Sequence, residues 1–315
     1  MHNDRSIKPA GKSVRTPGNL DRGPVEFKSH IASHDGEIMA IATRDVVSVQ
    51  PSMSIIAAVE TMTRCGFRRL PVIDAGSRKL RGIVTSGDII NFLGGGDKYN
   101  LVKVKHDGNL LAAINESVRT IMTPKMTTLP ESSTIAQAVD IIISNMVGGI
   151  PIVGNNDTME GIVTERDVMK TLAHETTDLC VEDIMSTALR VTSPDAPIGA
   201  VTRDMTRHRY RRLPVVTDDV LYGIVTTTDI VRYIGDKKVF SGMQTGDVKE
   251  VMSLPVRNLI SGQLFTTVPE RNVNDAAREM FERNVGALPV IEDARLIGLV
   301  TEFDLVKAFA RGRPG

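Results

Sequence analysis

The sequence contains few of the residues that covalent or metal chemistry requires. Its 315 residues include only 2 cysteines, Cys65 and Cys180, and 6 scattered histidines. These cysteines cannot build a disulfide framework or a CxxC metal knuckle, and the histidines show no HExxH or other paired-ligand spacing. No nucleophile elbow or P-loop is present either. The sequence therefore predicts neither a metal site nor a catalytic site.

An excess of charge of one sign and long apolar runs are also missing. Basic and acidic residues number 38 each, so the formal net charge is zero and no overall basic field favours nucleic acid or an anionic membrane. No apolar run approaches the ~18–20 residues of a membrane-spanning helix, and the N-terminus has no apolar signal core. With 41% hydrophobic and 24% charged residues, the composition is that of a globular protein, which we expect to be cytoplasmic.

What the sequence does contain is one short phrase that occurs four times. Its third copy reads RRLPVV over residues 211–216 and GIVTTTDIV over residues 223–231. In the four copies the central proline precedes the glycine by 11, 10, 9 and 9 residues, and the glycine always precedes an aspartate by 6. Self-similarity in so regular a frame indicates a repeat architecture.

Each copy predicts the same order of elements, with fold class α/β (α+β). A short strand should end near Pro51, Pro130, Pro194 or Pro269, and a helix should follow with an apolar face at i, i+3, i+4 and i+7. Two β-rich runs and a last helix complete a strand–helix–strand–strand–helix unit of ~55 residues, which needs a neighbour to bury its sheet. The predicted helix faces are Ile55, Ala58, Val59 and Met62; Ile135, Ala138, Val139 and Ile142; Ile198, Val201 and Met205, interrupted by Thr202; and Val273, Ala276, Ala277 and Met280.

The repeats alternate in type, which indicates that a two-repeat unit was duplicated. The first and third repeats share Arg-Arg-Leu-Pro-Val, whereas the second and fourth share Val-Gly-x-x-Pro. The predicted modules are residues 36–174, with repeats at about 38–95 and 117–173, and 180–311, with repeats at about 180–235 and 247–310.

Two stretches lie outside this plan. Residues 1–35 are poor in apolar side chains, and we expect a flexible tail. An insert from Gly94 to Glu116 joins the first two repeats. Its three glycines follow a helix instead of preceding one, so they predict a helix C-cap and a linker, not a phosphate loop.

The repeated phrase resembles the cystathionine-β-synthase (CBS) domain, and paired copies resemble Bateman modules. The resemblance covers residues 36–311. Tandem sets of this kind are similar to the γ subunit of AMP-activated protein kinase and to stand-alone archaeal CBS proteins. The resemblance implies two pseudo-symmetric modules that bind AMP, ADP, ATP or S-adenosylmethionine between their repeats, as regulatory ligands and not as catalytic cofactors. It also implies an unidentified regulated protein partner.

The resemblance also implies which residues would hold the ligand. In the family the Thr and Asp of Thr-x-x-Asp hold the ribose hydroxyls, and a carboxylate is a suitable acceptor for a cis-diol. The same pattern before an apolar helix is also a variant capping box that needs no ligand. The pairs concerned are Thr85 and Asp88, Thr164 and Asp167, Thr226 and Asp229, and Thr301 and Asp304.

Phosphate groups would need cations. The resemblance points to Arg68 and Arg211, with Arg283 nearby, and the alternative is solvated arginines at a strand edge. The small residues at the corresponding positions of the second and fourth repeats would let a flat base approach the backbone. The hydroxyl residues that open each repeat correspond to positions that often contact ligand in the family, although for any one of them a role in a turn or cap is the favoured interpretation. These residues are Thr43, Thr123, Ser186 and Ser253.

Four functional hypotheses remain open on the sequence alone. The favoured one is a non-enzymatic sensor of adenosyl ligands. The second is a scaffold in which the Thr-x-x-Asp pairs are only helix caps. The third is a nucleic-acid-associated regulator that uses the basic run 207–212, which could also be a phosphate site or a charged face; the zero net charge opposes it. An enzyme is least favoured, and both monomer and homodimer are possible.

Overall fold

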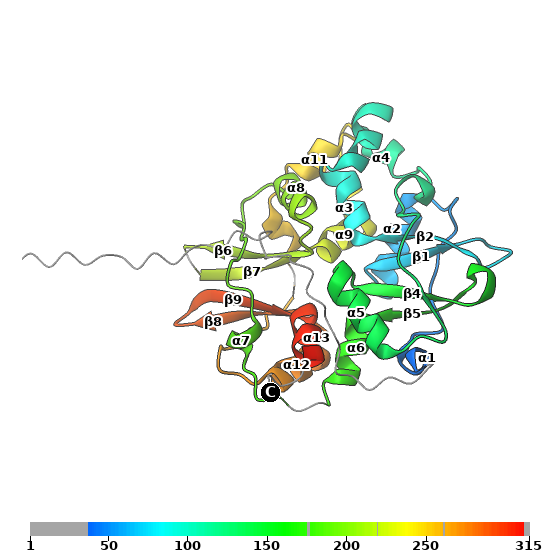
Figure 1. Ribbon diagram of the computed structural model, residues 1–315. Coiled ribbons are helices and arrows are strands. Elements are labelled where there is room, and N and C mark those ends of the chain that lie inside the picture. The colour runs from blue at the N-terminus through cyan, green and yellow to red at the C-terminus, as the bar shows by residue number, and fades with distance from the viewer. Residues whose placement is uncertain (1–36, 175–176, 219, 261, 312–315) are drawn as a thin grey trace, which may run out of the picture.

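The computed structural model describes residues 37–174, 177–218, 220–260 and 262–311, and the predicted N-terminal tail lies outside these ranges. Each repeat consists of a helix, an antiparallel hairpin and a second helix (Figure 1). Going from the first repeat to the fourth, these elements are α2 (Ile55–Cys65), β1 (Arg69–Ile73), β2 (Leu80–Thr85) and α3 (Ser86–Gly94); α5 (Ile135–Asn145), β4 (Gly149–Val153), β5 (Met159–Thr164) and α6 (Glu165–Leu172); α8 (Ile198–His208), β6 (Arg212–Thr217), β7 (Val220–Thr226) and α9 (Thr227–Gly235); α12 (Val273–Glu282), β8 (Ala287–Glu292), β9 (Arg295–Thr301) and α13 (Glu302–Arg311).

The predicted first strand of each repeat is present but very short. In the second repeat it is β3 (Leu129–Pro130), which pairs in parallel with β4. In the other repeats only a single parallel bridge to the next strand remains, for example between Val49 and Val72. The four hairpins have the same register around the central proline. Each proline lies opposite the residue after the glycine of the repeated phrase, as Pro71 does opposite Ile83.

Short helical segments connect the repeats. The insert after α3 is not an extended linker, because most of it is helical turns. The connecting segments are α1 (Ile38–Ile41), η1 (Asp97–Tyr99), η2 (Leu101–Lys105), α4 (Leu110–Ala113), η3 (Val118–Thr120), η4 (Asn155–Asp157), α7 (Val181–Ile184), α10 (Lys238–Ser241), α11 (Val248–Met252) and η5 (Val256–Leu259).

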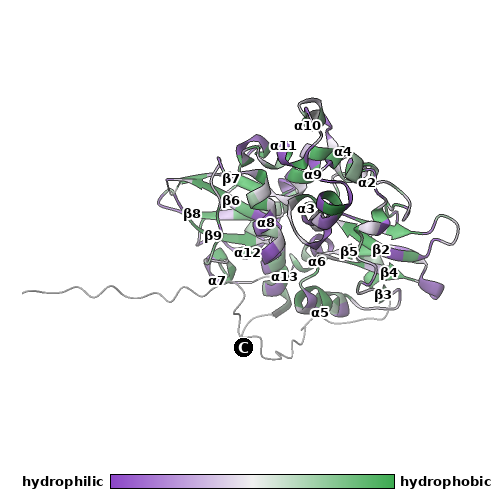
Figure 2. Cartoon of the chain, turned by 90° about the horizontal axis from the view of Figure 1, so that it is seen from above, coloured by the Kyte–Doolittle hydropathy of each residue, from purple (hydrophilic) through white to green (hydrophobic). Residues whose placement is uncertain are grey.

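The predicted apolar faces are the buried faces of the helices. Every residue predicted for the faces of α2, α5, α8 and α12 is buried. Figure 2 shows the strands mostly in the colours of apolar residues, while the helices carry both colours, as amphipathic helices do. Thr202, which interrupts the predicted stripe on α8, is itself fully buried and donates its hydroxyl to the Gly199 carbonyl at 3.1 Å.

Consecutive repeats exchange their opening segments. Thr43 of the first repeat bridges to Ile162 on β5 of the second, and Thr123 of the second bridges to Ile83 on β2 of the first. In the third and fourth repeats Ser186 bridges to Leu299 on β9. The hairpins of the first, second and fourth repeats are therefore each extended by a neighbouring repeat, which pairs the first repeat with the second and the third with the fourth.

The hydrophobic cores, however, run across these pairs. One buried cluster joins helices of the first and third repeats, where α2 packs on α9 and α3 on α8, and the other joins the second and fourth, where α6 packs on α13. Glycine permits the close contact: a Cβ added to Gly94 would lie 2.2 Å from Thr202 Oγ1, and one added to Gly235 would lie 2.2 Å from Thr63 Oγ1. The two sheet pairs thus lie on opposite sides of a helical middle (Figure 1).

Candidate functional site

All four Thr-x-x-Asp motifs form reciprocal helix caps. In the second repeat Thr164 donates its N–H and its hydroxyl to Asp167 Oδ2 at 2.8 and 2.7 Å, and the Asp167 N–H donates to Thr164 Oγ1 at 3.4 Å. The pairs at Thr85, Thr226 and Thr301 repeat this geometry within 0.2 Å. The capping interpretation is therefore confirmed as geometry, and it uses only one oxygen of each carboxylate.

The second oxygen distinguishes the four aspartates. Oδ1 of Asp88 accepts from the Lys98 ammonium, and Oδ1 of Asp229 is 3.3 Å from Nη1 of the half-exposed Arg232. Within the described residues, Oδ1 of Asp167 and Oδ1 of Asp304 accept no hydrogen bond. Burial raises the pKa of Asp304, and the hydrogen bonds from Thr301 offset only part of this rise. Asp167 and Asp304 therefore each keep an unused acceptor.

In each repeat the start of the hairpin lies beside the start of the second helix. The residue after the motif threonine donates its N–H to the carbonyl of the residue that directly precedes the hairpin. The four bonds are Ser86 to Arg68 at 2.8 Å, Glu165 to Gly148 at 3.2 Å, Thr227 to Arg211 at 2.9 Å and Glu302 to Gly286 at 3.2 Å. Ion pairs among Arg68, Glu165, Arg211 and Glu302 show that these four junctions lie close together. There the hydroxyls of Ser86 and Thr227 lie 2.8 Å apart.

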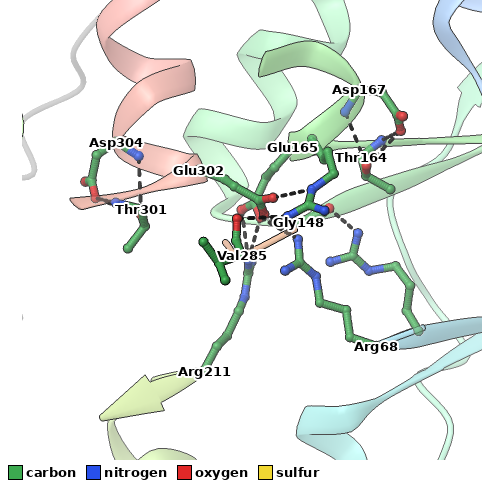
Figure 3. A network of polar contacts seen from close by, with 12 residues as sticks. Arg68, Gly148, Thr164, Glu165, Asp167, Arg211, Val285, Thr301, Glu302 and Asp304 are labelled. Atoms are coloured by element: carbon green, nitrogen blue, oxygen red, sulfur yellow. Dashed lines mark hydrogen bonds and ion pairs between the residues drawn. The ribbon is translucent and has the colours of Figure 1, made fainter. Parts of the chain in front are cut away.

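An ion cluster fills this convergence, and we call it the central cluster (Figure 3). Glu165 and Glu302, the first residues of α6 and α13, are each 1% exposed. Arg211 Nη1 lies 2.6 Å from Glu165, and Arg68 Nη2 lies 3.3 Å from Glu165 and 2.9 Å from Glu302. Arg166 Nε lies 2.6 Å from Glu302. The members of the central cluster are Arg68, Arg69, Arg166, Arg211, Arg212, Glu165 and Glu302.

The central cluster contains more cations than anions, namely five guanidinium groups and two carboxylates. Burial, with Arg68 nearby, lowers the pKa of Arg69 to about 9 and that of Arg212 to about 10. Burial alone would raise the pKa of Glu302, but Arg68 and Arg166 lower it by more, so it lies below its usual value. Such a surplus of positive charge in a partly buried place favours an anionic ligand.

Glycines provide the space for these arginines. A Cβ added to Gly148 would lie 2.4 Å from Arg69 Nη2 and 2.8 Å from Arg211 Nη1, and one added to Gly286 would lie 3.1 Å from Arg212 Nη2. Arg69 also donates to the Gly148 carbonyl. The sequence suggested that a ligand base approaches these small residues, but in the structure guanidinium groups occupy that space.

The other predicted site residues are more scattered. Thr123 Oγ1 lies 3.5 Å from Asp88, and Thr43 and Ser186 lie exposed beside the second repeat and fourth repeat hairpins. Ser253 does not occupy the equivalent place, because it follows α11, and the residue that contacts Gly223 of β7 is Ile260. Because the connection before the fourth repeat is longer, the residue equivalent to the other opening residues lies further along the chain than Ser253, near Ile260.

The remaining predicted cations lie away from the central cluster. Arg283 stacks on the ring of Phe265, with 5.0 Å between its guanidinium carbon and the ring centroid. The basic run 207–212 is divided: Arg207 and Arg209 are exposed at the end of α8, whereas Arg211 and Arg212 enter the central cluster. The run is thus not one continuous basic face.

Sequence reasoning missed the acidic half of the site and Lys98. Glu165 and Glu302 follow the motif threonine only in the second and fourth repeats, and the arginine pairs occur only in the first and third. This complementary alternation was a usable signal, since opposite charges at equivalent positions are expected to meet. Over the described ranges there is no group of three or more metal-ligating side chains, and no helix there is long and apolar enough to cross a membrane.

The fold and the repeated motif define the class of protein. A family model for the CBS domain matches residues 36–95, 118–174, 181–236 and 248–311, so the chain belongs to the CBS domain family. Among known proteins it is 38% identical to the protein MJ1225 of Methanocaldococcus jannaschii over 87% of this chain and 99% of that one. The crystal structure of MJ1225, described as a candidate archaeal homologue of g-AMPK, superposes with a TM-score of 0.83 over the same shares.

Two more distant matches agree with this fold. A 33.4 kDa protein encoded in a ribosomal RNA operon of Thermofilum pendens is 27% identical over 84% of this chain and 88% of its own length. A protein structure from Pyrococcus horikoshii, 20% identical, covers 85% of this chain and 97% of its own with a TM-score of 0.53. The Pyrococcus protein therefore shares the fold over 85% of this chain.

Proposed function

We propose that this protein is a non-catalytic regulatory protein that binds an adenosyl ligand, namely AMP, ADP, ATP or S-adenosylmethionine, and signals its presence to a partner protein. One observation carries the proposal: two aspartates with an unused carboxylate oxygen, Asp167 and Asp304, lie on either side of a central cluster with surplus positive charge (Figure 3). Together these features offer an acceptor for ribose hydroxyls next to donors for phosphates.

The chemistry of each half suits a nucleotide. A carboxylate oxygen accepts from the hydroxyls of a cis-diol, and a hydrogen bond to a charged group contributes roughly 1.5–3 kcal/mol. Guanidinium groups donate to phosphate oxygens in a planar, two-pronged geometry. The guanidinium group of Arg212 has no hydrogen-bond partner in the part of the chain that the structure describes, so it could bind such a ligand without breaking an existing side-chain bond.

Similarity to MJ1225 supports a regulatory interpretation over a catalytic one. That protein is described as a candidate homologue of g-AMPK, and the present chain covers 99% of it. CBS repeats account for most of the chain, which leaves little of it for a separate catalytic domain. We therefore rank the four functional hypotheses, from most to least favoured, as sensor, scaffold, nucleic-acid regulator and enzyme.

The central cluster also offers a way to transmit binding. Regulation requires that the ligand bind two conformations with different affinities. A phosphate that takes donors from Arg68 or Arg211 would compete with Glu165 and Glu302, which tie the repeats together. Ligand binding would thus change how tightly the modules are held, and a protein partner would recognise that change. Since the two modules already pack helix to helix within one chain, a second copy is not needed to bury those faces.

The capping geometry favours the scaffold as the second candidate function. Calorimetric titration of AMP, ADP, ATP and S-adenosylmethionine separates the two. Micromolar binding, about −8 kcal/mol, to the purified chain would support the sensor. If none of these ligands gives binding heat or raises the melting temperature, the motif aspartates are caps and the scaffold is the better description.

A further inference from the structure

The first repeat differs from the others because a lysine from the following segment, Lys98, is paired with its motif aspartate, Asp88. Lys98 Nζ donates both to Asp88 Oδ1 and to the Ile121 carbonyl. The side chains of Lys98 and Asp88 are only 19% and 11% exposed. Thr123, the opening hydroxyl of the second repeat, lies 3.5 Å from the same oxygen. The ammonium is therefore held by two acceptors, the Asp88 carboxylate and the Ile121 carbonyl.

The chain after α3 is shaped to deliver this lysine. Gly95 has a φ of +100°, which ends the helix and turns the chain back. The Asn91 side chain then fixes the turn, since its Nδ2 donates to Asp97 Oδ1 at 2.7 Å and its Oδ1 accepts from the Lys98 N–H at 3.0 Å. Gly96 passes so close that a Cβ there would lie 2.1 Å from Asn91 Oδ1. The backbone of Lys98 is thus anchored to the helix that carries Asp88.

No other repeat has this arrangement in the residues that the structure describes. Arg232 approaches Asp229 from the next turn of the same helix at 3.3 Å and is 48% exposed, which is a weak surface pair. Asp167 and Asp304 have an unused oxygen. Of the four motif aspartates, Asp88 alone forms an ion pair with a separate segment among the residues that the structure describes.

We infer that Lys98 is a built-in occupant of the first repeat's ligand position, which closes that position to adenosyl ligands while those at Asp167 and Asp304 stay open. This inference rests on the proposed function. A ligand's ribose would have to displace the ammonium from Asp88, so its apparent affinity equals the intrinsic affinity multiplied by the fraction of molecules in which Lys98 has moved away. Lys98 also lines an open surface hollow of about 570 Å³, with Asp97, Leu101, Val104, Lys105 and Thr120 among its walls, into which the side chain can swing.

The test is the number of ATP and AMP molecules bound per chain, measured by calorimetry and equilibrium dialysis, in the full chain and in Lys98→Met. Methionine keeps the apolar stem and removes the ammonium. We expect Lys98→Met to bind one more equivalent than the unsubstituted chain, at least tenfold more tightly than any residual binding at Asp88. Lys105→Met, which removes an exposed lysine of the same insert, should leave the stoichiometry unchanged.

A second variant shows where the extra equivalent binds. Asp88→Asn keeps an oxygen for the cap, and in the Lys98→Met background it should abolish the added equivalent, whereas alone it should change nothing. An unchanged stoichiometry in Lys98→Met, or a lost equivalent in Asp88→Asn alone, would overturn the inference while binding at Asp167 and Asp304 still supports the proposed function. If neither the unsubstituted chain nor Lys98→Met binds any adenosyl ligand, both are overturned.

Discussion

Arg68 of the first repeat donates a hydrogen bond to Glu302 of the fourth at 2.9 Å, although 234 positions separate them in the sequence. Glu302 also accepts from Arg166 of the second repeat, and Arg68 also reaches Glu165. Together with the pair between Arg211 and Glu165, these contacts join all four repeats in one cluster. The stability of the whole assembly and its response to ligand should therefore both depend on the central cluster.

Glu302→Gln should destabilise the chain. Breaking a fully buried ion pair costs ~3–5 kcal/mol. Because the side chains of Arg68 and Arg166 are 27% and 32% exposed, we expect a smaller loss of unfolding free energy, about 2 kcal/mol. Urea denaturation would give the free energy of unfolding. Asp275→Asn, which removes an exposed pair with Arg278, is the control and should have almost no effect.

The same carboxylate should make the stability depend on acidity. Because the pKa of Glu302 is below its unfolded value of 4.5, its stabilising contribution is fully present above pH 4.5. As the pH falls further, the unfolded chain binds a proton before the folded chain does, so stability is lost until the pH has passed the lower, folded pKa. Unfolding free energies measured across this acid range should fall less steeply in Glu302→Gln. An equal slope in both proteins would mean that other carboxylates cause the acid sensitivity.

Arg212→Gln should weaken phosphate-bearing ligands selectively. Its guanidinium is a surplus cation of the central cluster, and burial lowers its pKa to about 10, so its removal should not lower the free energy of unfolding. We expect about a tenfold loss of ATP affinity, or ~1.4 kcal/mol, and no change for adenosine, which has no phosphate. Equal losses for ATP and adenosine would place the phosphates elsewhere.

Gly94→Ala should disturb the packing of α3 on α8. The added Cβ would lie 2.2 Å from Thr202 Oγ1, so the helices must separate. Overpacking of this kind costs ~1–3 kcal/mol, whereas Gly76→Ala, with no atom within 4 Å of the new Cβ, is the matched neutral control. Thr202→Gly should recover part of the loss in the double variant, which a double-mutant cycle would measure. Additive losses would mean that the two positions do not share one contact.

Much of the repeat architecture could be predicted because it depends on residues that lie close together in the sequence. The constant spacing from glycine to aspartate predicted the second strand and the helix that follows it in each repeat, and the period of Ile55, Ala58, Val59 and Met62 predicted the buried face of α2. Thr202 was the exception: a polar side chain on an apolar stripe is buried because its hydroxyl bonds within its own helix and Gly94 of another module leaves it room.

The site was less predictable because its contacts are non-local. Arg68 and Arg211 were recognised as candidate cations, but their partners belong to other repeats, and nothing in a local window pairs position 68 with position 302. The insert from Gly94 to Glu116 was also only partly predictable. Its glycines correctly predicted the end of α3, yet the return of Lys98 to Asp88 depends on the side chain of Asn91.

The most direct measurement of the central claim is calorimetric titration of ATP into the intact chain and into Asp167→Asn, Asp304→Asn and the double variant. Asparagine keeps an oxygen for each cap, so the melting temperatures should change little. Each single variant should lose about tenfold or more of its ATP affinity at one site, and the double variant should lose both sites. ATP binding that is unchanged in the double variant would contradict the account.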